Sequence, residues 1–150
     1  MQRIFHTPEG VRDIYSQECS RKQKLQEKLH RVFHQYGFED IETPTFEYFE
    51  VFSKEVGTIP SRELYKFFDR EGNTLVLRPD FTPSVSRACA TYFNPEKEVV
   101  SLCYTGNTFI NNSSFRGRLK ETTQMGVERM GDDSPEADAE ILAMTVEGLL

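Results

Sequence analysis

The stretch LCYTGNTFINNSSFRGRLKETTQMGVERMG, residues 102–131, decides the fold that the sequence predicts. Segments at about residues 99–109 and 118–130 mix apolar, β-branched and polar residues in the way that strands do. The connection between them, residues 110–117, is rich in Asn and Ser and ends in Gly, which favours an irregular loop. We therefore expect two antiparallel strands joined by a long polar loop.

The second of these strands carries a row of polar residues on one face. Strand side chains alternate between two faces, so Gln124, Gly126 and Glu128 point the same way. The other face carries Met125, Val127 and Arg129. A carboxamide, a gap and a carboxylate suit the floor of a polar site better than a core, and Gly126 has no side chain to fill the space.

Apolar periodicity and turn residues predict the remaining elements. They are a helix from near Ser16 to Gly37, a strand at 38–42, a helix at 45–56, a hairpin of 64–68 and 74–77, a helix from Thr82 to about Phe93, and a helix capped by Ser134. Two hairpins require antiparallel pairing, so the predicted fold class is α+β, an antiparallel sheet flanked by helices.

Two of the predicted helices carry regular rows of apolar residues. In the helix at 45–56 the aromatic residues recur every third position, at Phe46, Phe49 and Phe52, which predicts one buried side. The last helix carries Ala139, Leu142, Ala143, Val146 and Leu150. It reaches residue 150 without a stop signal, which favours a piece of a longer protein.

Length and composition predict one polar, soluble domain of 150 residues with 37% hydrophobic and 28% charged residues. A formal net charge of −6 argues against a nucleic-acid partner. The three cysteines have no CxxC spacing, which favours reduced thiols in the cytoplasm. The chain starts without the apolar core of a signal peptide and has no run of about 20 apolar residues, so we expect no membrane partner.

Four polar residues could together hold an amino group: Asp80, Thr82, Gln124 and Glu128. An ammonium group has three donors and needs several acceptors, at least one of them charged. Each residue also has a simpler explanation. Thr82 suits the cap of the helix that Pro83 begins, Asp80 could cap that helix or pair with Arg78, and the other two could lie on a solvated sheet face.

Other kinds of chemistry have weaker support in the sequence. It has no Ser-His-Asp or Cys-His arrangement and no glycine-rich phosphate loop, so we expect no catalytic set and no cofactor. His30 and His34 lie four residues apart on the first predicted helix and could bind a metal. Because no HExxH pattern accompanies them, a solvated helix face is the preferred interpretation, and no metal site is predicted.

Four motifs resemble, in order, the catalytic core of histidyl-tRNA synthetase and its non-synthetase relative. They are TPEGVRD (residues 7–13), YGFEDIETPTFE (36–47), LRPDFTPSVSR (77–87) and GRLKETTQMGVERMG (117–131). The resemblance implies that residues 1–150 are the N-terminal part of a class II aminoacyl-tRNA synthetase core. The second motif is similar to motif 1, a dimer contact, and the long hairpin to motif 2. Motif 3 is absent from these residues.

The departures from the synthetase pattern favour the non-synthetase relative. On our alignment Thr105 stands where the synthetases have the arginine that grips the ATP α-phosphate, and Asn107 stands where they have Glu. A hydroxyl cannot replace a bidentate guanidinium on phosphate. Thr82, Gln124 and Glu128 match the family's contacts to the α-amino group of histidine, and Asp80 stands at the family's Glu.

The resemblance is closest to the regulatory subunit family of ATP phosphoribosyltransferase. It implies a non-catalytic subunit, needed for the first step of histidine biosynthesis, that pairs with a short-form catalytic subunit. It also implies feedback by histidine as an effector and self-association through the motif 1 region. Two alternatives stay open: a histidyl-tRNA synthetase with an atypical motif 2, and a dimerisation module with a vestigial pocket.

Overall fold

The computed structural model describes residues 5–53, 59–112 and 117–150. The predicted helix at 45–56 and the predicted loop at 110–117 therefore lie partly outside the described residues. Contacts divide the chain into two compact units. The first consists of residues 1–14, 43–87 and 106–124, and the second of 15–42, 88–105 and 125–150. The prediction of a single domain over residues 1–150 stays a prediction.

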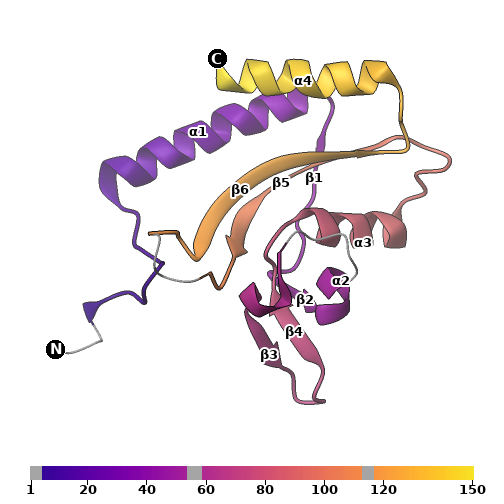
Figure 1. Ribbon diagram of the computed structural model, residues 1–150. Coiled ribbons are helices and arrows are strands. Elements are labelled where there is room, and N and C mark those ends of the chain that lie inside the picture. The colour runs from indigo at the N-terminus through magenta and orange to yellow at the C-terminus, as the bar shows by residue number, and fades with distance from the viewer. Residues whose placement is uncertain (1–4, 54–58, 113–116) are drawn as a thin grey trace. The chain divides into compact units, whose positions relative to one another are not determined.

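The second unit has its core where two helices cover a sheet (Figure 1). The helices are α1, Ser16–Gln35, and α4, Pro135–Leu149, and they lie side by side. The sheet has the order β1-β5-β6, from Glu39–Asp40, Val100–Phe109 and Glu121–Met130. The buried residues of the core between the helices and the sheet are Val32, Phe33, Phe38, Cys103 and Met144.

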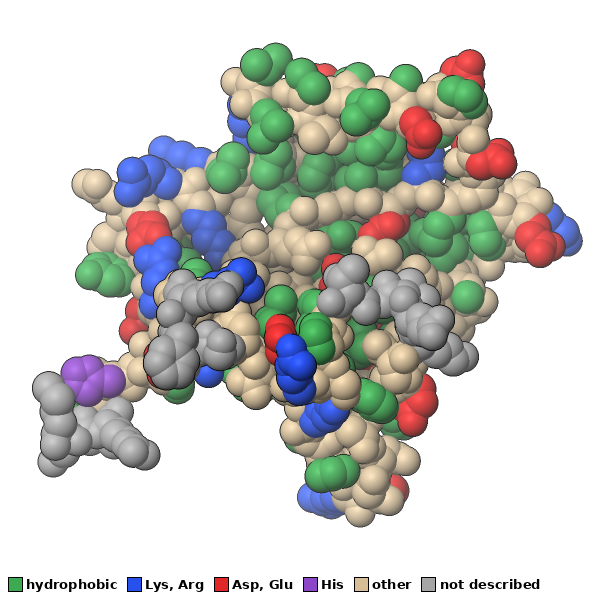
Figure 2. Space-filling view, viewed as in Figure 1, with side chains coloured by type: hydrophobic (Ala, Val, Ile, Leu, Met, Phe, Trp, Pro, Cys, Tyr) green, Lys and Arg blue, Asp and Glu red, His purple; other side chains and the backbone are tan. Residues whose placement is uncertain are grey.

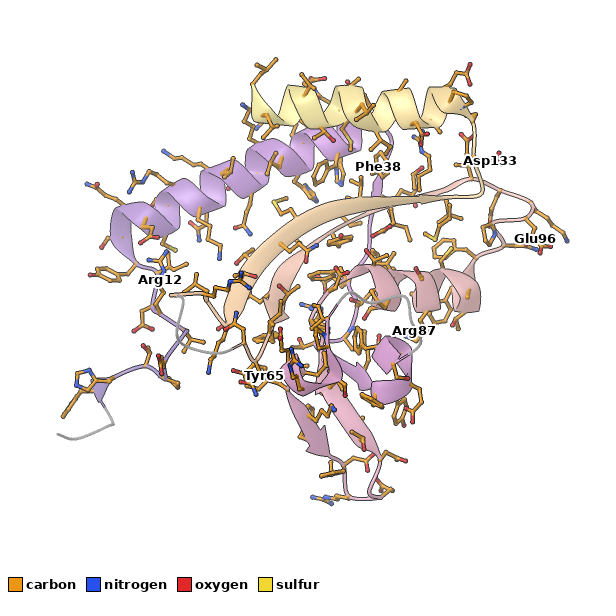
Figure 3. The ribbon with its side chains drawn as sticks, viewed as in Figure 1. Arg12, Phe38, Tyr65, Arg87, Glu96 and Asp133 are labelled. Atoms are coloured by element: carbon orange, nitrogen blue, oxygen red, sulfur yellow. The ribbon has the colours of Figure 1, made fainter. Side chains whose placement is uncertain are left out.

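The C-terminal end of α1 sets the path of the chain into this core. Gly37 has a φ of +79°, the left-handed conformation that glycine adopts without strain. The Gly37 N–H donates to the His34 carbonyl at 3.0 Å, and the Phe38 N–H donates to the Phe33 carbonyl at 3.1 Å. These two bonds are a Schellman motif, which folds Phe38 back beneath α1 and α4 (Figure 3). The predicted end of this helix near Gly37 is confirmed.

The first unit is built on a small antiparallel sheet of order β2-β4-β3 (Figure 1). Its strands are β2, Phe46–Tyr48, β3, Lys66–Phe68, and β4, Thr74–Leu77. The short helix α2, Phe49–Ser53, and the 3₁₀ helix η2, Ser61–Glu63, lie in the same unit. The predicted hairpin at 64–68 and 74–77 is confirmed, with β3 antiparallel to β4.

The sequence misplaced the start of the predicted helix at 45–56. Residues Phe46–Tyr48 are a strand that pairs with β4, and within the described part of the predicted helix Phe49–Ser53 are helical. The exposure of these three strand residues alternates, so Glu47 is buried while Phe46 is half exposed. The three-residue spacing of the aromatics misled the prediction, because Phe46 stacks edge-on against Phe67 of β3 instead of joining a helical face.

One further element differs from the prediction, and two others agree with it. The strand expected at 38–42 is the two-residue β1, and it pairs parallel to β5, so this sheet is mixed instead of purely antiparallel. The helix expected from Thr82 to about Phe93 is α3, Thr82–Tyr92, as predicted. The Ser134 cap is confirmed as well, because its Oγ accepts from the Ala137 N–H at 3.2 Å.

The apolar row that the sequence shows on α4 is mostly on the surface. Leu142, Val146 and Leu150 are exposed, and the buried residues of this helix are Ala137, Met144 and Gly148. Figure 2 shows apolar side chains gathered along α4 on the face in view. Among the described residues, no helix combines the length and apolar character that a membrane span requires.

Replacing Gly37 with Ala should destabilise the protein by about 1–2 kcal/mol, because a Cβ is strained in the left-handed conformation. No atom lies within 4 Å of the added Cβ, so the cost is conformational and not steric. Gly37→Asn is the matched control and should cost less, since Asn tolerates this conformation. Denaturant unfolding followed by circular dichroism measures both. Equal losses for Ala and Asn would contradict this account of the turn.

Candidate functional site

The first unit holds Asp80 and Thr82 at the start of α3. Thr82 is the first residue of the helix, and both side chains are half-buried. The Asp80 Oδ1 accepts from the Phe81 N–H at 2.7 Å, which uses one carboxylate oxygen to satisfy a backbone donor beside the helix start. This bond ties the Asp80 side chain to the residue just before α3.

Arg78 is the buried cation of this segment, and the sequence did not anticipate its role. Its Nη1 donates to the carbonyls of Thr43 and Pro44 at 2.8 and 3.3 Å, and its Nε donates to the Asn107 carbonyl at 2.8 Å. The guanidinium lies over the Phe81 ring, 4.1 Å from the ring centroid. Burial lowers the pKa of Arg78. Backbone carbonyls are therefore the partners that hold this guanidinium in place.

Gly106 of β5 permits the close approach of that strand to Arg78. A Cβ at this residue would lie 2.6 Å from Nη2 of Arg78 and 2.8 Å from Cζ of Phe81. Farther along the strand, the Phe109 N–H donates to the Arg78 carbonyl at 3.0 Å. The end of β5 in the first unit thus lies against the segment that precedes α3.

Gln124 also belongs to the first unit, on the part of β6 that is tied to β5. The hydroxyls of Thr108 and Thr122 are 3.0 Å apart, and the Thr123 hydroxyl donates to the Asn107 side chain at 2.8 Å. The Ile110 N–H donates to the Lys120 carbonyl at 2.9 Å. Asp80, Thr82 and Gln124 therefore come from adjoining elements of one unit.

Glu128 lies in the second unit, where the predicted gap beside it is filled. A Cβ on Gly126 would lie 2.4 Å from the hydroxyl of Tyr104, a buried residue of β5. Gly126 therefore makes room for a neighbouring aromatic ring and does not leave open space, which corrects that part of the prediction. Glu128 is half-buried, and its convergence with the three residues of the first unit stays a prediction.

The structure weakens the argument against ATP binding that the sequence drew from Thr105. Tyr104 points toward Gly126, so the next side chain, that of Thr105, points to the opposite face of β5. Asn107 shares the Thr105 face, and its amide donates to Glu121 at 2.7 Å. An arginine at residue 105 would therefore face away from the side that carries Gln124, Gly126 and Glu128.

A hollow of about 490 Å³ opens on that opposite face, within the second unit. Its lining includes His30 of α1, Asp40 of β1 and Thr105 of β5. A hydrogen bond from His30 is the main reason that the pKa of Asp40 is lowered. Burial, reinforced by the neighbouring Asp40, raises the pKa of the Cys103 thiol to about 12. His30, His34, Asp40 and Cys103 lie close together here. The sequence pattern did not reveal this cluster, because Asp40 lies on β1 and Cys103 on β5, whereas both histidines lie on α1.

The mixture of helices with small antiparallel and mixed sheets, and the motifs at Asp80–Thr82 and along β6, define the class of the protein: a partial class II aminoacyl-tRNA synthetase catalytic core. The predicted α+β fold class is confirmed. A family model described as histidyl-tRNA synthetase matches residues 10–150, and the chain belongs to that family.

Individual relatives agree with this assignment. The chain is 44% identical, over 97% of its length, to an ATP phosphoribosyltransferase regulatory subunit of Ruminiclostridium cellulolyticum. A crystal structure of an ATP phosphoribosyltransferase regulatory subunit/histidyl-tRNA synthetase from Bacillus halodurans matches 97% of the chain at 33% identity with a TM-score of 0.83. Apo histidyl-tRNA synthetase of S. aureus matches 95% of it at 27% identity with a TM-score of 0.75.

The matched parts of these relatives are limited. The chain spans 35% of the length of the Ruminiclostridium protein, 38% of the Bacillus chain and 33% of the S. aureus chain. Similarity over this part alone does not establish the activity, ligands or partners of the whole protein.

Replacing Arg78 with Lys should destabilise the first unit by about 2–4 kcal/mol, because an ammonium group cannot satisfy the three buried carbonyls at once. Arg70→Lys, an exposed change beside the β3–β4 turn, is the matched control and should stay within about 0.5 kcal/mol of the parent. Denaturant unfolding measures both. If Arg78→Lys is as stable as the control, the carbonyl clamp is not what holds this segment.

Proposed function

We propose that the protein is the regulatory subunit of ATP phosphoribosyltransferase. It acts in the cytoplasm with a short-form catalytic subunit in the first step of histidine biosynthesis. The observation that carries the proposal is the name shared by its curated relatives, at up to 44% identity over nearly the whole chain. The formal net charge of −6 agrees with a protein partner better than with tRNA.

The proposed effector is histidine, held by Asp80, Thr82, Gln124 and Glu128. Two carboxylates, a hydroxyl and a carboxamide supply the acceptors that an α-ammonium group needs. The contacts of the first unit support this assignment, because Arg78 and Gly106 bring the helix start that carries Asp80 against the strand pair that carries Gln124.

We also propose that the protein does not activate histidine with ATP. The motif 2 comparison at Thr105 gives little support, since that side chain lies on the other face of β5. Better support comes from the face that Gly126 shares with Tyr104. By alternation this face of β5 carries Leu102, Tyr104, Gly106 and Thr108, none of which is cationic. The guanidinium that lies against Gly106 is that of Arg78, and backbone carbonyls already hold it, so we do not assign it to an α-phosphate.

A second candidate function is that of a histidyl-tRNA synthetase, favoured by the family match and by the S. aureus structure. It requires an arginine from elsewhere in the protein to reach the α-phosphate of ATP. A dimerisation module with a vestigial pocket is the third candidate. Self-association through the motif 1 region, residues 36–47, is compatible with all three.

The proposed function predicts that the whole protein co-purifies with the ATP phosphoribosyltransferase catalytic subunit and raises the activity of that subunit, with inhibition by histidine. It also predicts no pyrophosphate exchange when the protein is given ATP and histidine. The exchange assay should use an active histidyl-tRNA synthetase as its positive control. Exchange above the blank, or failure of the two subunits to associate, would overturn the proposal.

The proposed site predicts that Glu128→Gln weakens histidine binding about tenfold or more, because one of the two charged acceptors of the ammonium group is lost. Glu121→Gln is the matched control: the same change on the opposite face of the same strand, where Glu121 accepts from Asn107. It should leave affinity within about twofold. Calorimetry on the whole protein measures both, and equal losses would show that the assumed strand faces are wrong.

A further inference from the structure

Four side chains of the second unit come together on the face of β5 opposite Tyr104. They are His30 and His34 from α1, Asp40 from β1 and Cys103 from β5, and one ligand atom from each lies within 4.8 Å of the other three. None of these four residues belongs to the proposed histidine-binding set. The cluster therefore calls for an explanation of its own.

Asp40 is the centre of the cluster. Its Oδ1 lies 2.6 Å from Nε2 of His30 and 3.4 Å from Sγ of Cys103, and its Oδ2 lies 3.0 Å from Nε2 of His34. The two imidazole rings lie side by side, with centroids 4.1 Å apart. Two nitrogen donors, one sulfur donor and one carboxylate thus share a single small volume.

The backbone holds these side chains in place. His30 and His34 are four residues apart on α1, so they lie on the same helix face. In the parallel pairing of β1 with β5, Asp40 is the register partner of Cys103, and the Ile41 N–H donates to the Cys103 carbonyl at 2.9 Å. The Schellman turn at Gly37 connects α1 to β1 within a few residues. Ligands on rigid elements are preorganised for binding.

We propose that His30, His34, Asp40 and Cys103 form a binding site for one zinc-class divalent cation. Imidazole, thiolate and carboxylate are the ligand types of zinc sites, whereas magnesium and calcium take oxygen ligands. Tetrahedral bond lengths of about 2.0–2.3 Å set neighbouring ligand atoms about 3.3–3.8 Å apart. The separations here, from 2.6 Å to at most 4.8 Å, span that range, so modest side-chain rotations suffice.

The cation can reach this site from solvent. The side chains of His30, His34 and Asp40 are 41%, 43% and 55% exposed, while Cys103 is buried at the base of the cluster. His30 and Asp40 also line the hollow that Thr105 borders. A bound cation would link α1 to the β1–β5 pair, and the site would add a metal-dependent constraint to the core of this unit.

The competing explanation is a hydrogen-bonded cluster in which two histidines share one carboxylate and no cation binds. The two explanations differ in their response to zinc and to the loss of single ligands. The test uses the whole protein, freed of metal with a chelator and titrated with Zn²⁺ against a chromophoric competitor. Co²⁺ serves as the spectroscopic probe, because a thiolate ligand gives it a charge-transfer band in the near ultraviolet.

The proposal expects one Zn²⁺ per chain attributable to this cluster, and a Co²⁺ charge-transfer band. His34→Gln should weaken Zn²⁺ binding at least about tenfold, and Cys103→Ser should abolish the band. Matched controls are His6→Gln and Cys19→Ser, which should change neither result. Because Cys103 is in the core, His34→Gln, an exposed change, keeps the test valid if Cys103→Ser fails to fold.

Two results would overturn the cation site. One is the lack of any Zn²⁺ binding that competes with the chromophore at micromolar concentration. The other is binding with the same affinity and stoichiometry in the parent and in His34→Gln, which would place the ion elsewhere. Neither result bears on the association with the catalytic subunit or on histidine binding, so this inference and the proposed function can fail separately.

Discussion

Side-chain alternation along β5 and β6 is the constraint on which the rest of the structure depends. Cys103 of β5 points into the helix-covered core, and the next residue, Tyr104, points to the opposite face against Gly126. On β6, Met125 and Val127 pack against the same core, which leaves Gln124 and Glu128 for the other face. A slip of one residue would exchange the polar row and the core residues between the two faces of the sheet.

The first unit depends on a buried cation that is satisfied by the backbone instead of by an acid. A buried guanidinium needs several acceptors, and Arg78 finds three carbonyl groups and an aromatic face. Because these carbonyls belong to the main chain, the bonds from Arg78 fix the backbone positions of residues 43–44 and of Asn107. The ion pair between Arg87 and Glu47, at 2.8 Å, adds a side-chain link from α3 to β2 in the same unit.

Local sequence signals predicted the elements that local physics determines. Gly37 after an apolar helix face, Ser134 before Pro135 and the turn ahead of Asn73 each fix a boundary with residues that are adjacent in the chain. The prediction of a helix at 45–56 failed where a tertiary contact, the pairing of β2 with β4, overrode a three-residue aromatic spacing.

What the sequence could not predict was which distant residues meet. The candidate acceptors Asp80, Thr82, Gln124 and Glu128 were found through resemblance and strand alternation. Arg78 and Tyr104 were missed, because their roles depend on Asn107 and Gly126, residues more than 20 positions away. The cluster around Asp40 was missed for the same reason: only the parallel pairing of β1 with β5 brings the carboxylate to Cys103.

The two faces of the β5–β6 strand pair therefore carry different sets of side chains. The face of Tyr104 and Gly126 continues along the strands to the acceptors proposed for an amino group, while the face of Cys103 and Thr105 borders the hollow and the histidine cluster. Adjacent residues of β5 share one backbone, so a single register sets the position of Cys103 on one face and of Tyr104 on the other.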